Sequence, residues 1–378
     1  MKKSQTPGRI PVGISSCLLG ESVRYDGGHK FDTTINTCLG EYFEFRSFCP
    51  EVAIGMGVPR EPIQLVRTNA GLAVLGIKHP EQDFSVALAA YGEQVASNNA
   101  ELCGYIFKAR SPSCGLRHVR TVDKTGKVAQ KNGTGAYSLA VARTRPNLPV
   151  IEEGALADEG ARDNFIEQVR IYHRWQQVLI QGITPARLIH FHTCHKLTLM
   201  AHNQSACRRM GKLVAAVTPG TMSETSHLYE SELMGTLRRP ATRRSHTNVL
   251  QHLQGYFSKH LDPDERAVLT TAIDRYRLGE VPLEVPLSLF RHHCTTYPHD
   301  WVQQQTAIED LAAGYNGTVN VSGLDRPIRL DGAFVTPNAF SSLRVEPIRG
   351  RTFQAGEELP DAPRVAILGW QLWQDRFG

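Results

Sequence analysis

The sequence of 378 residues has no apolar run that approaches the ~20 residues a membrane-spanning helix needs. No apolar stretch follows its basic start, so we expect no secretory signal and a cytoplasmic location. Internal repeats and low-complexity segments are also missing, and 21% of the residues are charged against 41% that are hydrophobic. This balance is typical of globular domains and excludes wholesale disorder, collagen-like chains and coiled coils.

Closely spaced CxxC pairs are absent as well, although the chain has eight cysteines. Zinc ribbons need such pairs, so the cysteines do not form one. In a reducing compartment, cysteines more often serve as metal ligands, nucleophiles or buried thiols than as disulfides. These three roles remain open for them.

Acidic residues are scarce in one region of the chain. Residues 181–260 contain three Asp or Glu, ten Lys or Arg, and eight of the fifteen histidines. A local excess of positive charge of this kind predicts an anionic partner for the region.

The length and the sequence patterns predict three segments. Residues 1–157 alternate short apolar runs with stretches of helical spacing, which predicts an α/β domain with a parallel sheet in Rossmann-like layers. Its expected strands are 11–16, 102–108 and 148–151, and its expected helices are 84–100 and 136–142.

The second segment, 160–312, is expected to be mostly α-helical, since apolar residues recur every three to four positions. The clearest helical stretches are 165–181, 188–202, 248–260 and 263–278. The third segment, 313–378, has strand-like patterns at its start and again in ArgValAlaIleLeu near its end. It is expected to be a short β-rich fragment.

Three cysteines stand in short Gly, Pro or Ser-rich contexts. These are IleSerSerCysLeuLeuGly (14–20), PheCysProGluVal (48–52) and SerProSerCysGly (111–115). Each cysteine follows a short apolar run, so one edge of a parallel sheet could hold all three. Three thiolates on separate loops suit an iron–sulfur cluster with one iron left open. The alternative is that they are buried, unreactive thiols.

Residues 10–155 resemble the TudS-type desulfidase family. The resemblance rests on SerCysLeuLeuGly (16–20), ArgTyrAspGlyGly (24–28), CysProGluVal (49–52), GlyValProArgGluPro (57–62) and LysAlaArgSerProSerCysGly (108–115). It implies a 4Fe–4S cluster held by Cys17, Cys49 and Cys114, with an open fourth iron that binds the sulfur of a thiolated pyrimidine. Water then replaces that sulfur and sulfide is released, with no net redox change.

The resemblance also implies roles for residues near these cysteines. Glu51 would be the catalytic acid or base, and its alternative role is a structural salt bridge to Arg60 or Arg110. Ser111 would contact the substrate, or it could cap a turn. The residues expected to shape the substrate pocket are Arg24, Tyr25, Asp26 and Ser113, although Asp26 could simply be a turn residue.

The second segment carries a basic set, dense around 236–246, that we expect to contact nucleic-acid phosphates. Its members are Lys196, Arg208, Arg209, Arg238, Arg239, Arg243, Arg244 and His246. The alternative is a solvated charged face. Helical spacing of His192, His195 and His202 leaves a metal site as a weaker alternative, because the HisGluxxHis pattern is missing.

Residues 162–305 are similar to the YbgA-like helical domain through the stretches 195–202, 248–257, 281–287 and 291–293. Fused to a desulfidase domain, it resembles RudS-type proteins, which remove sulfur from 4-thiouridine in transfer RNA. This implies that the basic helices bind the RNA and that the thiolated base is splayed into the pocket. Tyr256 and Phe257 are expected to pack in the core, with base stacking as the alternative.

From about residue 314 the sequence resembles part of the periplasmic core region of MacB-like permeases, which we interpret as a junction artefact or a recent fusion.

Taken together, the first two segments predict an iron–sulfur desulfidase that acts on 4-thiouridine in transfer RNA. One alternative is a desulfidase for free thiouracil bases or nucleosides. Another is a non-catalytic, nucleic-acid-binding iron–sulfur protein. We expect no membrane span and no obligate protein partner.

Overall fold

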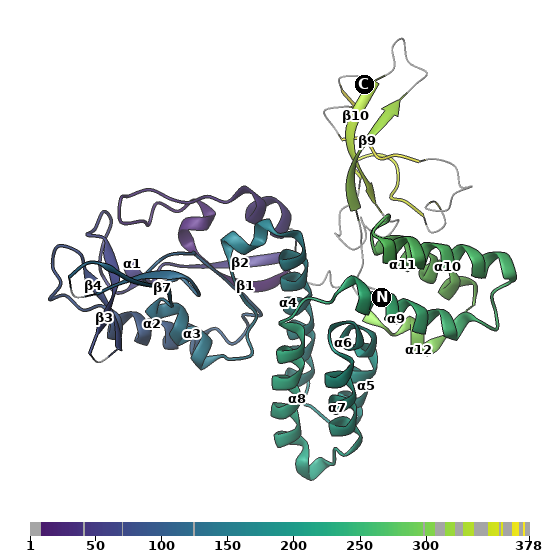
Figure 1. The fold of residues 1–378 in the computed structure, drawn as a ribbon, viewed down its shortest axis with the longest axis horizontal. Helices are drawn as coiled ribbons and strands as arrows, with labels where there is room; N and C mark the ends of the chain where they lie inside the picture. Colours follow the sequence, from purple (N-terminus) through teal and green to yellow (C-terminus); the bar gives the residue numbers. More distant parts are fainter. Residues whose placement is uncertain are drawn as a thin grey trace. The chain divides into compact units, whose positions relative to one another are not determined.

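The computed structural model describes residues 9–306 except 41, 70, 124 and 298, and beyond them 314–321, 328–335, 347–354, 357, 365–369, 373 and 374. The chain divides into two compact units, whose helices and strands are labelled in Figure 1. The first unit comprises Met1–Arg187 and Val217–Pro240, and the second comprises Leu188–Ala216 and Ala241–Gly378.

The first unit contains a parallel four-stranded sheet in the order β2-β1-β5-β8, so the predicted α/β domain is confirmed. Gly13 in the central strand lies under the Tyr105 ring of the neighbouring strand, where a Cβ atom would stand 2.4 Å from that ring. The strands are β1 (Ile10–Ser15), β2 (Phe43–Phe48), β5 (Tyr105–Phe107) and β8 (Val150–Glu152).

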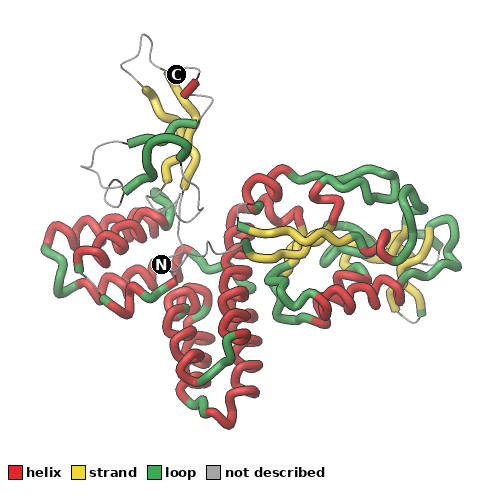
Figure 2. The backbone as a smooth tube through the Cα atoms, turned by 180° about the vertical axis from the view of Figure 1, so that it is seen from behind, coloured by secondary structure: helices red, strands yellow, loops and turns green. Residues whose placement is uncertain are grey.

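A second four-stranded sheet, which was not predicted from the sequence, has the order β4-β3-β6-β7. Its strands are among those drawn in yellow in Figure 2. Strands β3 and β4 form an antiparallel hairpin, β3 pairs with β6 in parallel, and β6 pairs with β7 in antiparallel fashion. Their bounds are β3 (Ile63–Thr68), β4 (Gly71–Gly76), β6 (Val119–Val122) and β7 (Val128–Gly133).

Helices α2 (Ser85–Asn98) and α3 (Ala136–Thr144) pack closely in this unit. At their contact, a Cβ atom on Gly92 would lie 2.7 Å from the Tyr137 carbonyl oxygen. The remaining helices are α1 (Pro50–Ala53), α4 (Glu159–Ile180) and α8 (Met222–Leu237), and short turns of helix are η1 (Ser16–Leu19), η2 (Ile35–Leu39), η3 (Glu153–Ala157) and η4 (Pro219–Thr221).

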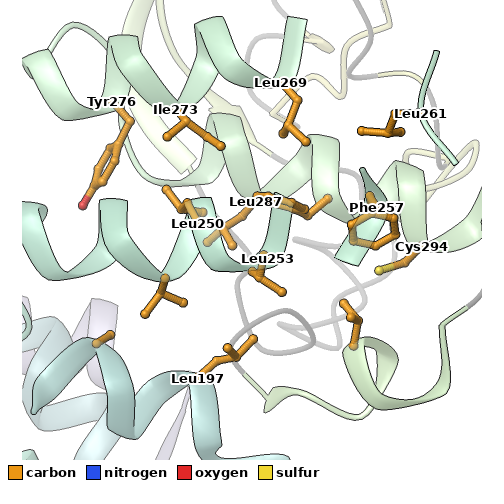
Figure 3. Packing of buried hydrophobic residues seen from close by; sticks show 14 residues of the cluster. Leu197, Leu250, Leu253, Phe257, Leu261, Leu269, Ile273, Tyr276, Leu287 and Cys294 are labelled. Carbon is orange, nitrogen blue, oxygen red and sulfur yellow. The ribbon is translucent and has the colours of Figure 1, made fainter. Parts of the chain in front are cut away.

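Helices dominate the second unit up to residue 303, as the sequence predicts. They are α5 (Pro185–Cys194), which begins in the first unit, α6 (Lys196–His202), α7 (Gln204–Ala215), α9 (Arg243–Phe257), α10 (Pro263–Leu278), α11 (Glu284–Thr296) and α12 (Asp300–Gln303). The core of this unit is formed by apolar side chains of α6 and α9–α12 (Figure 3).

The helix expected over 188–202 is divided at His195 into α5 and α6. The His195 ring stacks on Phe191 with ring centroids 4.1 Å apart, and its Nδ1–H donates to the Phe191 carbonyl oxygen at 2.8 Å. The His195 side chain and its backbone amide thus both donate to the Phe191 carbonyl oxygen. The spacing of apolar residues does not predict this competition.

The C-terminal segment contains an antiparallel pair, β9 (Gly314–Val321) and β10 (Ile328–Val335), in agreement with the strand patterns there. The last of those patterns is not a strand, because residues 365–368 have no regular structure. Among the helices of the described residues, none is long and apolar enough to cross a membrane.

Candidate active site

Three cysteines come together at the carboxyl ends of adjacent parallel strands. Cys17 follows β1, Cys49 follows β2 directly, and Cys114 lies on the loop after β5. Since the strand order is β2-β1-β5, these ends are neighbours. The three free thiols line one cavity of about 310 Å³, which also has Glu51 in its wall.

Short turns position the first two cysteines. Cys17 lies in η1, which ends at Gly20 in the left-handed conformation with φ 92°. The Cys17 carbonyl oxygen accepts a hydrogen bond from the Lys30 amide at 2.8 Å. Cys49 is the N-cap of α1, whose first residue is Pro50, a residue suited to the start of a helix. Both thiols therefore stand where a strand turns sharply away from the sheet edge.

The Cys114 loop is held by its own serine and glycine. Ser111 Oγ accepts hydrogen bonds from the amides of Ser113 and Cys114 at 3.3 and 3.2 Å, so the turn-capping role considered for Ser111 is present. A Cβ atom on Gly115 would lie 2.9 Å from the Ser111 carbonyl oxygen. The SerProSerCysGly motif thus closes a tight turn that leaves Cys114 in the cavity wall.

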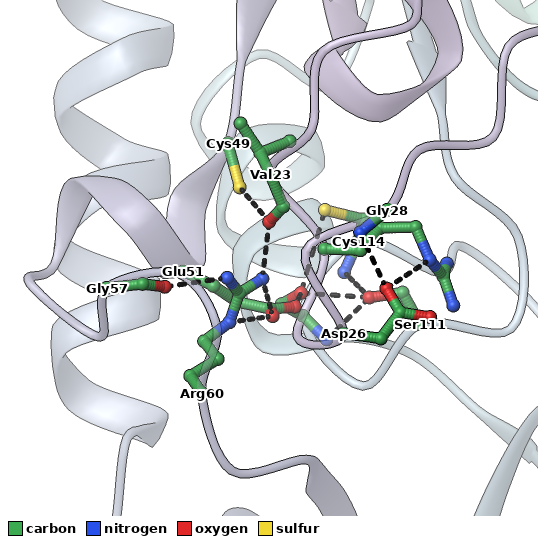
Figure 4. Close-up of polar contacts among 11 residues, drawn as sticks. Val23, Asp26, Gly28, Cys49, Glu51, Gly57, Arg60, Ser111 and Cys114 are labelled. Atoms are coloured by element: carbon green, nitrogen blue, oxygen red, sulfur yellow. Dashed lines mark hydrogen bonds and ion pairs between the residues drawn. The ribbon is translucent and has the colours of Figure 1, made fainter.

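Glu51 is held from both sides (Figure 4). The Arg60 guanidinium donates to its Oε2 through Nε at 2.9 Å and Nη2 at 2.5 Å, and the Ser113 hydroxyl donates to its Oε1. Arg60 also donates to the carbonyl oxygens of Val23 and Gly57, both at 2.9 Å. The salt bridge considered for Glu51 is therefore made with Arg60, and it presents the carboxylate to the cavity in a fixed orientation.

The serines of the motif lie at different depths. Ser111 lines the cavity, whereas Ser113 is fully buried behind it. Their hydroxyl oxygens are 2.9 Å apart, and Ser113 Oγ is also 3.7 Å from the Cys114 sulfur. Ser113 thus links the carboxylate, the other serine and a cysteine.

In the ArgTyrAsp motif (24–26), two residues line the cavity and the third stabilises a turn. Arg24 and Tyr25 line the cavity, and the Arg24 guanidinium lies 5.3 Å from the centre of the Tyr25 ring. Asp26 instead holds the turn, since its Oδ1 accepts from the Gly28 amide at 3.1 Å. That hydrogen bond is the main reason why the pKa of Asp26 is lowered.

Burial governs the protonation of the three thiols. It raises the pKa of Cys17 to about 11, although the positive charges of Lys108 and Arg24 partly oppose this. It also raises the pKa of Cys49 and of Cys114, to which the negative charge of Glu51 adds in both cases. Without a bound metal, the thiols therefore stay protonated at neutral pH, and metal binding would have to displace their protons.

The donor set has the chemistry that a metal–sulfur cluster needs, because three thiols on separate loops line one cavity. Within the described part of the chain, no three His, Cys, Asp or Glu side chains converge closely enough to hold one ion. A cluster is wider than an ion and needs thiolates spread around one cavity, on separate loops. The cations Arg24 and Lys108 in the same wall would offset the negative charge of thiolates.

The residues that brace this cavity, among them Glu152 at the end of β8 and Glu153 in η3, were not predicted from the sequence. Lys108, the first residue after β5, forms an ion pair with Glu153. Glu152 Oε1 accepts from the Leu116 amide at 2.8 Å, and Ser15 Oγ accepts from the Lys108 amide at 2.9 Å. The position of Lys108 at the start of a motif was the available signal. The two glutamates had none, because their partners are distant in sequence.

The structure does not gather the predicted basic set on one unit. Arg238 and Arg239 belong to the first unit, and the other members belong to the second. The Arg238 guanidinium donates to the Pro146 carbonyl oxygen. Arg243 donates to the Tyr276 carbonyl oxygen at 2.5 Å, and His246 Nδ1 lies 2.8 Å from the Tyr276 hydroxyl. At least three members therefore have structural contacts of their own.

The histidines considered as metal ligands form no three-ligand group among the residues that the structure describes. His192 and His195 are buried, and His195 hydrogen-bonds to the backbone through Nδ1. Burial lowers the pKa of His192 to about 4, and the positive charge of Lys196 adds to this effect. A neutral, packed histidine is the description that fits His192.

Comparisons with known proteins agree with the fused arrangement of two domains. Residues 12–153 match the 2-thiouracil desulfurase family, and residues 196–310 match a family described as a protein of unknown function (DUF1722). The first match supports a desulfidase activity on thiouracil-type substrates.

Two curated proteins and one solved structure are similar to parts of the chain. Uncharacterized protein YbgA of Escherichia coli is 34% identical over 39% of this chain and 88% of its own length. Uncharacterized protein YbbK of Bacillus subtilis is 28% identical over 38% of this chain and 97% of its own. The structure of the [4Fe-4S]-dependent thiouracil desulfidase TudS is 26% identical, with a TM-score of 0.33, and covers 39% of this chain and 94% of that one.

Proposed function

The chain belongs to the family of YbgA, joined here to a desulfurase-type domain, and on this premise we propose that it removes sulfur from 4-thiouridine in transfer RNA. One observation carries the proposal. Cys17, Cys49, Cys114 and Glu51 line one cavity, within the segment that matches 2-thiouracil desulfurases.

In this proposal Cys17, Cys49 and Cys114 hold a 4Fe–4S cluster. When bound, the cluster supplies an open iron, a soft Lewis acid suited to the sulfur atom of the substrate. Arg24 and Tyr25 border the space in which the thiolated ring would lie. In this scheme the thiolated ring enters the cavity with its sulfur toward the three cysteines.

Glu51 acts as the general base in this scheme. It takes a proton from the water that attacks the ring carbon bearing sulfur. The carbon–oxygen double bond forms, the carbon–sulfur double bond breaks with its electrons on sulfur, and the two protons of the water, one of them passed on by Glu51, leave with the sulfur as hydrogen sulfide, without any redox change. Arg60 and Ser113 keep the carboxylate oriented during this step, because they bond to its two different oxygens.

The helical domain recruits the RNA in the same proposal. Its support is the excess of Lys and Arg over Asp and Glu in residues 181–260, together with the exposed side chains of Arg208 and Arg244. Arg209 and Lys196 are exposed too, whereas Arg243 and His246 contribute mainly through packing. A target base inside folded RNA must leave its stack to enter the cavity.

The test is an anaerobic reconstitution of the full chain with iron and sulfide. Transfer RNA containing 4-thiouridine, and separately free 4-thiouracil, are added while thiocarbonyl absorbance and released sulfide are followed. Turnover of the RNA supports the proposal. Turnover of the free base alone would show instead that the chain is a desulfidase of free nucleobases. An assembled cluster with turnover of neither would favour the non-catalytic alternative.

A further inference from the structure

A group of aromatic rings lies at the rim of the core of the second unit. Tyr256 in α9 and Trp301 in α12 stack with ring centroids 4.8 Å apart, and the His299 ring is 5.3 Å from Tyr256. Their sequence neighbours Phe257 and Val302 are 1% and 0% exposed. Those neighbours therefore fill the core, while the three rings, which we call the aromatic site, remain half-buried at its edge.

The aromatic site has an unused hydrogen-bonding group. The Nδ1 atom of His299 is buried and has no hydrogen-bond partner within the described residues. Buried polar atoms are normally paired, and an orphaned one indicates a missing partner. A ligand with polar edges around a flat ring would supply such a partner.

Positive charge adjoins the aromatic site. The Lys196 ammonium lies 6.0 Å from the centre of the Trp301 ring. Helix α7 adjoins Lys196, since the Cys207 thiol lies 3.8 Å from the Lys196 carbonyl oxygen, and it exposes Arg208 and Lys212. Residues 168–223, which include Lys196 and α7, contain no Asp or Glu, whereas Asp300, between His299 and Trp301, is an exposed carboxylate.

We propose that the aromatic site binds an unpaired nucleobase of RNA, with Lys196 and α7 contacting the adjoining phosphates. This inference rests on the proposed function and specifies the RNA element recognised. A base in a duplex is stacked and paired, so only a single-stranded or splayed base can lie against protein rings. Stacking on aromatic side chains tolerates any base, whereas the polar atoms of His299 and Trp301 can bond to its edge.

The experiment measures binding of fluorescein-labelled RNA to the full chain by anisotropy. One probe is a short single strand, and the other is the same strand annealed to its complement. The variants are Trp301→Leu, Trp301→Phe and, as a matched control, Tyr297→Leu. Tyr297 is a half-buried aromatic residue that packs on the same core, but its hydroxyl donates to Glu265 at 3.2 Å.

Trp301→Leu is expected to weaken single-strand binding by about fivefold or more, as for the loss of one stacked base, and to leave duplex binding unchanged. Trp301→Phe should retain most of the affinity, and Tyr297→Leu should match the parent. Equal losses for both probes, or no loss for the single strand, would overturn the inference. Circular dichroism of each variant identifies a loss that comes from unfolding.

Failure of RNA recruitment and failure of the aromatic site alone give different results. If the parent binds neither probe yet desulfurises free 4-thiouracil, RNA recruitment fails and this inference fails with it. If the parent binds and desulfurises RNA but Trp301→Leu behaves like the parent, only the aromatic site is wrong. Parent-level turnover of free 4-thiouracil by Trp301→Leu would support a role in RNA binding alone.

Discussion

The cysteine-lined cavity and the basic helices acquire their residues in different ways. The cavity is built from strand ends, so the order β2-β1-β5 places Cys49, Cys17 and Cys114 at one edge of the sheet. The basic residues lie on helices, and packing uses several of them, such as Arg238 and Arg243. Chain topology gathers a buried site reliably, whereas the charge of a segment does not say which side chains stay available.

The largest effect should come from the cavity cysteines. Cys114→Ala removes one of the three proposed cluster ligands from the cavity wall, so we expect sulfide release to fall to background. The control is Cys103→Ala, since Cys103 is also buried but its thiol donates to the Glu101 carbonyl oxygen at 3.3 Å. Iron content and sulfide release of both variants are measured. Normal turnover in Cys114→Ala would exclude Cys114 as a cluster ligand.

Glu51→Gln should reduce turnover by about 10²–10⁴-fold, the range for loss of a general base. Cluster absorbance should persist, because the amide retains the size and one acceptor oxygen of the carboxylate. Glu44→Gln serves as the control, because Glu44 forms an exposed ion pair with Arg46 on β2. A Glu51→Gln variant as active as Glu44→Gln would exclude the base assignment.

Arg60→Gln tests the clamp around Glu51. The two side chains are 4% and 14% exposed, and removal of one partner of a buried pair costs about 3–5 kcal/mol. We expect a loss of that order in the free energy of unfolding, measured in denaturant. The exposed pair on β2 gives the contrast, since Arg46→Gln should cost about 0–1 kcal/mol. Equal costs would show that burial of the Arg60 pair is irrelevant.

His192 should make the second unit sensitive to acid. Its pKa falls from 6.5 to about 4 on folding, so its contribution is complete above pH 6.5 and is lost as the pH falls to 4. This shift corresponds to about 3 kcal/mol at most. Compared with the parent, His192→Gln should lose less stability between pH 7 and 4 in thermal unfolding. Parallel pH curves would contradict the prediction.

The smallest effect should separate two adjacent arginines. Arg244→Gln should weaken RNA binding a few-fold without a change in stability. It should also reduce the slope of log binding constant against log salt concentration by about 0.9, the value for one phosphate contact. Arg243→Gln should instead lower the melting temperature, because Arg243 bonds to the last turn of α10 and lies 4.6 Å from the centre of the Tyr276 ring. The reverse result would interchange the two roles.

Several helices and strands were predicted correctly from local sequence patterns. The helix expected over 263–278 is α10, with Asp262 as N-cap and Gly279 in the left-handed conformation at its end. The second sheet was missed: its β3–β4 and β6–β7 pairs are local hairpins that were not recognised in the sequence, and only the β3–β6 pair joins strands distant in sequence. Pairing partners distant in sequence leave no local signal, and the same holds for the ion pair of Lys108 with Glu153.

The sequence by itself determined the α/β character of the first segment and the helical character of the second, the cysteine, glutamate and serine motifs, and the excess of positive charge over 181–260. Only the tertiary structure decided that Glu51 pairs with Arg60 rather than Arg110, that Ser113 is buried while Ser111 faces the cavity, and that Tyr256 remains at the rim while Phe257 enters the core. The reason is that motifs specify chemistry and local turns, whereas burial and partner choice depend on which distant segments pack together.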